Sequence, residues 1–403
     1  MTFLVSLLAA IFSITANPGE NCDTQMNLSW AADGSTVRSY VLYKKSGESD
    51  ALSLRADSKG TYCPVYNNEH SKTAGGGNFY EDARFFKHGV SLDGLKPDCD
   101  YEYRIFAISS EGDTAVSRVG RFHTSGARHW KACVISDFHT YPPLPGRLDA
   151  AMGMMEKIER RYGYDWVLSL GDVCAWGGSW SFWKEMYSRR QFADYMWGGV
   201  NGNHDNMTRH YRLTNEFFRN ATNNPLNGYE GEMGVCYWFR YGDALFIMLN
   251  NEDMRDQAGF EKAFSWVDSV LEANADARYK VVCEHYQWFF GTDGKTSQYG
   301  RWHELFEKHG VDLALAGNNH IYVRAHSEGV TYVQTPSSDD ERGQDPVAPL
   351  AYNSDKIDFR WNEGPHTVGA LLLDATPSRM RLSLLDRNGK VLDKVNVRPK
   401  VNR

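Results

Sequence analysis

Five short and mostly apolar runs along the chain each end at polar residues. Runs of four or five residues are too short for helices and match buried strands. They cover residues 132–136, 166–170, 196–200, 281–284 and 313–316. Between these runs, apolar residues recur at three- and four-residue steps, which predicts amphipathic helices over residues 147–162, 256–273 and 297–309. Strand patterns that alternate with helix patterns favour an α/β domain.

The pattern differs in the first third of the chain. There, apolar and polar residues alternate over short runs such as 37–43 and 101–107, and clusters of Gly, Pro, Asn and Asp separate them. Short alternating strands with frequent turns predict a β-sandwich. The length of 403 residues also exceeds what one hydrophobic core usually serves. We therefore expect an all-β domain over residues 17–126, followed by an α/β domain over residues 127–403.

The N-terminal segment allows two interpretations. Residues 3–16 are apolar, which is too short for a membrane span. They fit the core of a signal peptide that ends near Ala10 or Ala16, and the protein would then be secreted, periplasmic or bound at the cell surface. The positive residues that usually precede such a core are missing, because Arg38 is the first Lys or Arg. The alternative is a first β-strand over residues 11–16.

Composition excludes some partners. The net charge is −7 with 44 Lys and Arg residues, which argues against nucleic acid or an anionic membrane surface as the main ligand. A small anionic substrate is compatible with this charge if metal ions supply positive charge locally. The seven cysteines include no CxxC pair, so a zinc ribbon is not indicated. In an exported protein, Cys22, Cys63 and Cys99 would provide one disulfide.

The polar residues after the five apolar runs are the types that bind metal ions. They are Asp137, His139, Asp172, Asn203, His204, Asp205, His285, Asn318 and His320. In an open α/β sheet, the carboxyl ends of the strands lie along one edge, where ligands bind. A Gly-Asp pair or a lone His after a strand is usually only a turn or a packing residue, but five such segments in this order predict a metal centre.

A centre of this composition suits phosphoryl transfer. Two divalent ions about 3.5–4 Å apart can clamp the attacking and leaving oxygens of a displacement, and a hydroxide between them would be the nucleophile. We expect Asp172 to bridge the ions, because it directly follows the central run. Asp137 and His139, two positions apart, would reach one ion. Asn203 would bind through its amide oxygen, with His285 and His320 completing the two ligand shells.

Two further residues are predicted to act on the substrate. His204 is adjacent to Asn203 and is expected to face the substrate, where it would polarise a phosphate oxygen or protonate the leaving alkoxide. Asp205 is expected to hold the ring of His204 in the required tautomer.

These motifs resemble the calcineurin-like metallophosphoesterase superfamily over residues 130–335, whose signature runs Asp-x-His, Gly-Asp, Gly-Asn-His-Asp, His and Gly-His-x-His. Within that superfamily the chain is most similar to the purple acid phosphatases, which carry a fibronectin-like domain before the catalytic one. Residues 90–104 resemble the E–F corner of a fibronectin type III domain, and residues 317–324 are similar to the Gly-His-x-His-x-Tyr-x-Arg motif. The resemblance implies a four-layer αββα domain after a β-sandwich, and a small phosphorylated substrate.

The chain departs from the purple acid phosphatase pattern at three positions. Ala175 replaces the family's tyrosine ligand, and His139 replaces a glycine, so no purple colour is expected and the case for ferric iron is weakened. Asn318 replaces the first His of the last motif. By resemblance, Asn318 would bind the second metal with Asp172, Asn203 and His285. Because an amide oxygen is a weaker donor than imidazole for zinc or iron, we expect a weaker second site, and Mn, Zn, Fe or Mg all remain candidate ions.

The resemblance favours hydrolysis of phosphate monoesters. Hydrolysis of phosphodiesters or nucleotides is the alternative within the same superfamily. A non-catalytic surface-binding protein with a decayed metal site is the alternative of another class, and Asn318 favours it. Candidate substrate-binding residues are Tyr322 and Arg324, with Trp176 and Trp288 as aromatic candidates that more simply pack in the core.

Overall fold

The computed structural model describes residues 10–65, 83–126, 128–178, 180–206, 216–289, 298–339 and 355–400. The first nine residues of the predicted leader lie outside these ranges. Strand β1 (Ile11–Pro18) occupies the remainder of the segment. Cleavage after Ala16 would remove most of this strand, whereas cleavage near Ala10 would leave it whole. Within the described ranges, no helix is both long and apolar enough to cross a membrane.

All five apolar runs are strands, as predicted. They are β10 (Trp130–Ile135), β11 (Trp166–Ser169), β12 (Met196–Gly199), β15 (Tyr279–Cys283) and β16 (Leu313–Ala316). The three predicted helices are α1 (Gly146–Tyr162), α5 (Gln257–Ala273) and α6 (Tyr299–His309). The side chain of Asp256 accepts a hydrogen bond from the backbone N–H of Gly259 (2.8 Å), which satisfies one of the free donors at the start of α5. Gly310, in the left-handed conformation, ends α6.

The five strands belong to two sheets, not to one open sheet as their common edge suggested. A ten-stranded sheet has the order β22-β21-β20-β10-β11-β12-β1-β2-β6-β5, and a seven-stranded sheet has the order β13-β14-β15-β16-β18-β17-β19. The strands not yet bounded are β13 (Tyr237–Tyr241), β14 (Ala244–Met248), β17 (Tyr322–Ser327), β18 (Val330–Gln334), β19 (Ile357–Trp361), β20 (Gly369–Thr376), β21 (Arg379–Asp386) and β22 (Val391–Val397). An apolar run reports burial on both faces but not which sheet it joins, so the sequence pattern did not separate the two groups.

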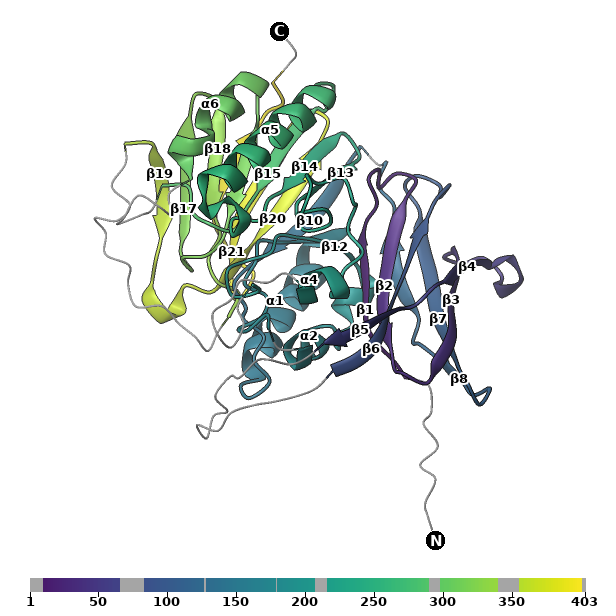
Figure 1. The fold of residues 1–403 in the computed structure, drawn as a ribbon. Helices are drawn as coiled ribbons and strands as arrows, with labels where there is room; N and C mark the ends of the chain where they lie inside the picture. The colour runs from purple at the N-terminus through teal and green to yellow at the C-terminus, as the bar shows by residue number, and fades with distance from the viewer. Residues whose placement is uncertain are drawn as a thin grey trace.

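The two sheets pack face to face between two layers of helices. Alternate residues of β10 show this arrangement, since Val134 belongs to the core between the sheets and Cys133 to the core under the helices. Helices α1, α2 (Trp180–Met186) and α4 (Glu216–Ala221) cover the ten-stranded sheet, and α5 and α6 cover the seven-stranded one (Figure 1). A short helix, α3 (Gln191–Asp194), precedes β12. The αββα layering implied by the resemblance is confirmed.

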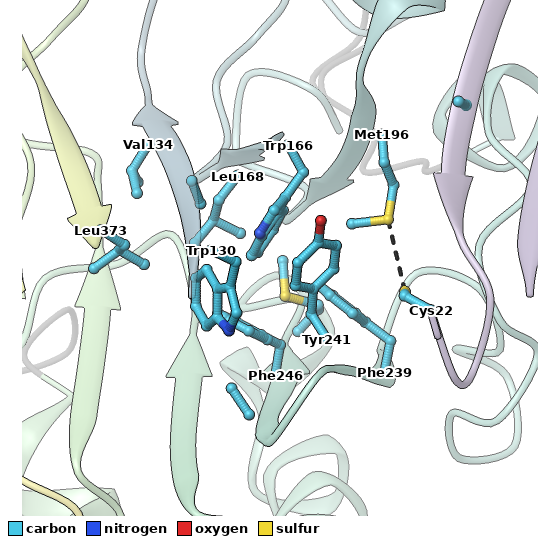
Figure 2. Packing of buried hydrophobic residues seen from close by; sticks show 14 of the residues in the cluster. Cys22, Trp130, Val134, Trp166, Leu168, Met196, Phe239, Tyr241, Phe246 and Leu373 are labelled. Atoms are coloured by element: carbon cyan, nitrogen blue, oxygen red, sulfur yellow. Dashed lines mark hydrogen bonds between the residues drawn. The ribbon is translucent and has the colours of Figure 1, made fainter. Parts of the chain in front are cut away.

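Aromatic side chains fill the space between the two sheets. Trp130 and Trp166 of the ten-stranded sheet both contact Phe246 of the seven-stranded sheet edge-on, with ring centroids 5.9 and 4.9 Å apart (Figure 2). Full burial of one such side chain stabilises the fold by roughly 2–3 kcal/mol. These contacts hold the two sheets, and therefore the ends of their strands, in one relative position.

The N-terminal sandwich shares the larger sheet. Its strands β2 (Met26–Ala32), β5 (Thr61–Val65) and β6 (Ala83–Leu92) extend that sheet beyond β1. The facing sheet contains β3 (Thr36–Lys45), β4 (Leu54–Ser58), β7 (Asp100–Ser109), β8 (Thr114–Val116) and β9 (Gly120–His123). The hydroxyl of Tyr101 accepts a hydrogen bond from the backbone N–H of Lys96 (2.9 Å), which is the tyrosine corner expected of a fibronectin-like fold.

One hydrogen-bonded sheet therefore crosses the predicted domain boundary. Strand β1 pairs in parallel with β12, with Ala16 opposite Met196, and the sandwich lies directly against the α/β part (Figure 1). The hydroxyl of Tyr103 adds a bond to the carbonyl of Ala193 (2.9 Å). The predicted boundary between the domains of residues 17–126 and 127–403 remains a proposal. The sheet that both domains share indicates that they fold together.

The cysteine prediction is wrong in one respect. No disulfide joins any of the seven cysteines, all of which lie in the described ranges, so the one considered for Cys22, Cys63 and Cys99 is not formed. Cys22 instead packs in the core, where its sulfur lies 3.6 Å from the sulfur of Met196 (Figure 2). Cys133 and Cys283 are buried in strands, as expected of small apolar side chains.

Candidate metal centre

The loops after the five strands converge, although three strands belong to one sheet and two to the other. Three overlapping groups of side chains form there, and within each group the candidate ligand atoms lie within 4.8 Å of one another. The groups are Asp137 with His139 and His320, His139 with Asp172 and His204, and Asp137 with Asp172 and His285. Because the groups share members, the side chains form one continuous cluster.

Asp172 lies at the middle of this cluster. Its Oδ2 is 3.4 Å from Nε2 of His139 and 3.3 Å from Nε2 of His285. On one side, Nε2 of His285 is 3.1 Å from the amide oxygen of Asn203. On the other, Nε2 of His320 is 3.3 Å from Oδ1 of Asp137. A carboxylate with imidazoles on both sides is placed as a bridging ligand would need to be.

Three imidazoles are held through the nitrogen that faces away from the cluster. Nδ1 of His139 donates to the carbonyl of Asp137 (2.8 Å), and Nδ1 of His285 donates to that of Leu170 (2.6 Å). Nδ1 of His204 donates to the carbonyl of Ala175 (3.0 Å). In a neutral ring, a backbone bond of this kind leaves the lone pair on Nε2, as His139 and His285 would require to bind a metal.

The backbone at the cluster is strained. Five members have left-handed φ angles between 42° and 76° without being glycine, and only three other described residues share this property. The five are Asp137, His139, Asp172, Asn318 and His320. Such conformations cost on the order of 1–3 kcal/mol each and persist where the surroundings impose them. Their concentration at one place indicates a functional site.

Two glycines allow the loops to meet. A Cβ atom on Gly202 would lie 2.3 Å from Oδ1 of Asp172, and one on Gly317 would lie 2.4 Å from Oγ of Ser136. Neither distance is sterically possible without movement of the carboxylate loops. The Gly-Asn-His-Asp and Gly-Asn-Asn-His motifs therefore begin with glycine because another loop passes directly over it.

The electrostatics of the cluster favour cations. Burial raises the pKa of Asp172, but the neighbouring His285, His204 and His139 outweigh it and hold the pKa well below its usual value. Burial lowers the pKa of His285, but the charge of Asp172 outweighs it and raises the pKa to about 10. The imidazoles thus favour the ionised form of the carboxylate, as a divalent ion would also do. Carboxylate, imidazole and amide donors fit borderline and hard divalent ions.

The members of the cluster differ in burial. Asp137, His139, Asp172 and His285 are almost fully buried. Asn203, His204 and Asn318 are half-buried. His204 is therefore one of the cluster members that a substrate could contact.

The sequence analysis predicted that Asp205 orients the ring of His204, but in the structure Asp205 has other partners. Its two oxygens accept hydrogen bonds from the backbone N–H groups of Cys174 and Gly202 (2.9 Å each), and the carbonyl of Ala175 holds the ring instead. Buried backbone donors require acceptors, and Asp205 supplies them for two loops at once. Burial, together with the charge of Asp172, raises the pKa of Asp205 to about 7.

The candidate substrate-binding residues have other partners. The hydroxyl of Tyr322 donates to Oδ2 of Asp393 (2.9 Å), and Nε of Arg324 donates to the same oxygen (2.7 Å). Both residues lie on β17 and Asp393 lies on β22, so these bonds connect the two sheets. Trp288 is buried against Phe306. The structure gives these three residues packing and bridging contacts.

The structure also reveals a supporting residue that the sequence analysis missed. The amide oxygen of Asn251 accepts from the backbone N–H groups of His285 and Tyr286 (2.8 Å each), and its amide nitrogen donates to Oε2 of Glu284 (2.9 Å). Asn251 follows the apolar run 244–249, which ends at polar residues as the other five runs do. Polar residues that follow a short apolar run are candidate site residues, and this signal also marks Asn251.

Asn318 has a partner of its own. Its backbone N–H lies 3.2 and 3.1 Å from the two oxygens of Asp137, and its amide nitrogen donates to Oε1 of Gln287 (2.5 Å). Gln287 is buried. Because Gln287 takes the amide nitrogen, the amide oxygen of Asn318 is the atom left for a metal.

Comparison with known families accounts for this arrangement. Residues 131–322 match the calcineurin-like phosphoesterase family, and residues 11–124 match the purple acid phosphatase N-terminal domain. The chain thus carries a calcineurin-like phosphoesterase domain after a purple acid phosphatase N-terminal domain. The chain is 26% identical to two uncharacterized proteins of Mycobacterium tuberculosis over 272 residues, which cover 58% of this chain and 50% of theirs. It thus spans about half the length of the curated relatives it matches.

Solved structures show the same fold. A purple acid phosphatase from yellow lupin (Lupinus luteus) superposes with a TM-score of 0.72 at 16% identity, over 96% of this chain and 74% of the lupin chain. PhoD superposes with a TM-score of 0.62 at 13% identity, over 94% and 88% of the two chains. GAP50, described as the anchor in the inner membrane complex of Plasmodium, superposes with a TM-score of 0.52 at 14% identity, over 68% and 90%. At these identities the likeness establishes the fold.

Proposed function

We propose that this protein is a metal-dependent hydrolase of phosphate monoesters. The observation that carries the proposal is the central place of Asp172, within 3.4 Å of His139 on one side and 3.3 Å of His285 on the other. Two divalent ions bound there would supply positive charge for the phosphate and would activate water for attack. Asp137, His139, His320 and Asp172 would hold one ion, and Asp172, Asn203, His285 and Asn318 the other.

The role proposed for His204 is that of general acid. Its side chain is half-buried, and its Nδ1 is bonded to the carbonyl of Ala175. A proton on Nε2 would pass to the leaving alkoxide, while the bond from Nδ1–H to the carbonyl keeps the ring in place. Asp205 would act indirectly, because it ties the loop of Gly202 to the loop of Cys174.

A second candidate function is that of a binding protein with an incomplete metal site. Asn318 favours it, because an amide replaces an imidazole of the family motif. The fold does not decide between the two functions, since it occurs both in a purple acid phosphatase and in a protein named as an anchor. Metal content separates them, because an enzyme of the proposed kind should hold two ions per chain.

The test uses metal-free protein reloaded with Mn, Zn, Fe or Mg. Hydrolysis of p-nitrophenyl phosphate and of its bis-ester is measured together with bound metal. Asp172→Asn should abolish turnover, whereas Asp276→Asn, which alters an exposed ion pair with Arg240, should not. Faster turnover of the bis-ester would favour a phosphodiesterase. An absence of turnover with any metal, together with one bound ion or none, would favour the binding protein.

A further inference from the structure

A tryptophan lies beside the proposed general acid. Trp176 is half-buried, and its ring centroid is 6.3 Å from that of His204, with the two ring planes 64° apart. Both chain neighbours of Trp176 are bonded to His204. The carbonyl of Ala175 accepts from the ring Nδ1 (3.0 Å), and the N–H of Gly177 donates to the backbone carbonyl of His204 (2.8 Å). The two hydrogen bonds therefore hold the backbone on both sides of Trp176 against His204.

The loop that carries Trp176 has little freedom to move. A Cβ atom on Gly177 would lie 1.6 Å from the carbonyl oxygen of Asp205, so the two loops touch through their backbones. The carbonyl of Gly177 also accepts from the indole N–H of the buried Trp183 (2.9 Å). These contacts fix the backbone on the C-terminal side of Trp176 close to the loop that carries His204.

We propose that Trp176 forms the wall of the leaving-group subsite and selects phosphate esters whose leaving group is an aromatic ring. The inference rests on the proposed function, since it takes His204 as the proton donor. An oxygen that receives this proton must lie within about 2.6–3.2 Å of the donor nitrogen. A leaving group that extends from that oxygen toward Trp176 would lie against the indole, whose ring centroid is 6.3 Å from that of His204 and which offers a large flat apolar surface.

The chemistry of that surface favours planar partners. Stacked or edge-to-face aromatic pairs gain interaction beyond the burial of their area, whereas a short alkyl group covers little of an indole. The tryptophan therefore acts on the choice of ester and not on the phosphoryl group itself. Ala175 and Trp176 take adjacent positions in the chain, so the loop that lacks a tyrosine ligand carries the aromatic residue one position later.

The experiment compares phenyl phosphate with ethyl phosphate for the wild type, Trp176→Ala and Trp176→Phe, each loaded with metal. The ratio of kcat/KM values between the two esters is followed across variants, which cancels the better chemical leaving ability of phenol. Trp176→Ala should lower this ratio about 3- to 10-fold, and Trp176→Phe should keep most of it. Tyr40→Ala removes another half-buried aromatic, on β3 of the sandwich, and should leave the ratio unchanged.

A binding measurement makes the result independent of turnover. Phenylphosphonate and methylphosphonate cannot be hydrolysed, and calorimetry of the metal-loaded protein gives their affinity ratio. A wild-type preference for phenylphosphonate that Trp176→Ala removes supports the subsite, even if no ester is turned over and the proposed hydrolysis fails. Equal losses for both esters and both phosphonates would show that Trp176 only packs, and would overturn the inference while the hydrolase stands.

Discussion

Asn251 allows a test of how a residue beside the candidate metal ligands holds one of them, His285, in position. Its carboxamide makes three hydrogen bonds, two from the backbone N–H groups of His285 and Tyr286 and one to Glu284. The side chain is 3% exposed, so water does not replace these partners freely. Asn251→Ala would remove all three bonds and leave two buried N–H groups without an acceptor.

The magnitude follows from those unpaired groups. Each buried donor left unsatisfied costs about 1–3 kcal/mol, so two set an upper range of about 2–6 kcal/mol. Partial relaxation of the turn after β15 lowers this, and we expect about 3 kcal/mol. Because that turn aims His285, metal affinity should also fall by roughly 10- to 100-fold, as is typical when support of a ligand is lost.

The assay combines stability with metal affinity. Urea unfolding of the metal-free protein gives the change in the free energy of unfolding, and competition with a chelator gives the affinity for Zn and Mn. Asn274→Ala is the matched control, because Asn274 is also buried but donates one bond, to the carbonyl of Val270 at the end of α5. We expect that control to lose about 1 kcal/mol and no metal affinity.

Two results would refute this reasoning. If Asn251→Ala loses no more stability than the control, its three bonds do not contribute as their burial implies. If it loses stability but binds both metals like the wild type, the turn does not position His285, and Asn251 supports only the fold.

Two other predictions concern the metals and the sandwich. Asn318→His should raise the affinity of the second site for Zn relative to Mn, because imidazole is the better donor for Zn. Calorimetry with each metal gives the ratio of the two affinities. An unchanged ratio would show that Asn318 is not a ligand. Burial lowers the pKa of His88 to about 4, below the usual value near 6.5. Between these two pH values the unfolded chain therefore binds more protons than the folded protein. The free energy of unfolding should fall as the pH drops from 6.5 to 4. His88→Phe should keep the stack on Trp30 and lose this pH dependence in urea unfolding, and equal losses in both proteins would contradict it.

The local elements follow closely from the sequence. The helix predicted over residues 147–162 is α1 (Gly146–Tyr162), and Leu148, Met152, Met155 and Ile158 are buried on it. The helix predicted over residues 256–273 is α5, with Asp256 as its N-cap. Such elements depend on side chains within a few positions of one another, which periodicity reports directly. The candidate ligands were found in the same way, because each stands in the loop that follows a strand.

Contacts between residues far apart in the chain could not be predicted from the sequence pattern. The sequence did not show that β10–β12 and β15–β16 lie in different sheets, because helices cover one face of each strand and the opposite sheet covers the other. It also suggested that Tyr322 and Arg324 face a substrate. Both bind Asp393, about 70 positions away, and no local pattern reports that partner.

The sequence by itself determined where the strands end and which polar residues stand near those ends, and hence the candidate metal ligands and the resemblance to a phosphoesterase family. The tertiary structure alone decided that Asp172 lies between His139 and His285, that five residues of the cluster adopt left-handed backbone, and that Asp205 holds loops instead of the ring of His204. The physical reason is the range of the forces involved. Strand and turn formation is set by neighbours along the chain, whereas the partner of a buried polar group is whichever donor or acceptor the packing of two sheets brings within hydrogen-bond distance.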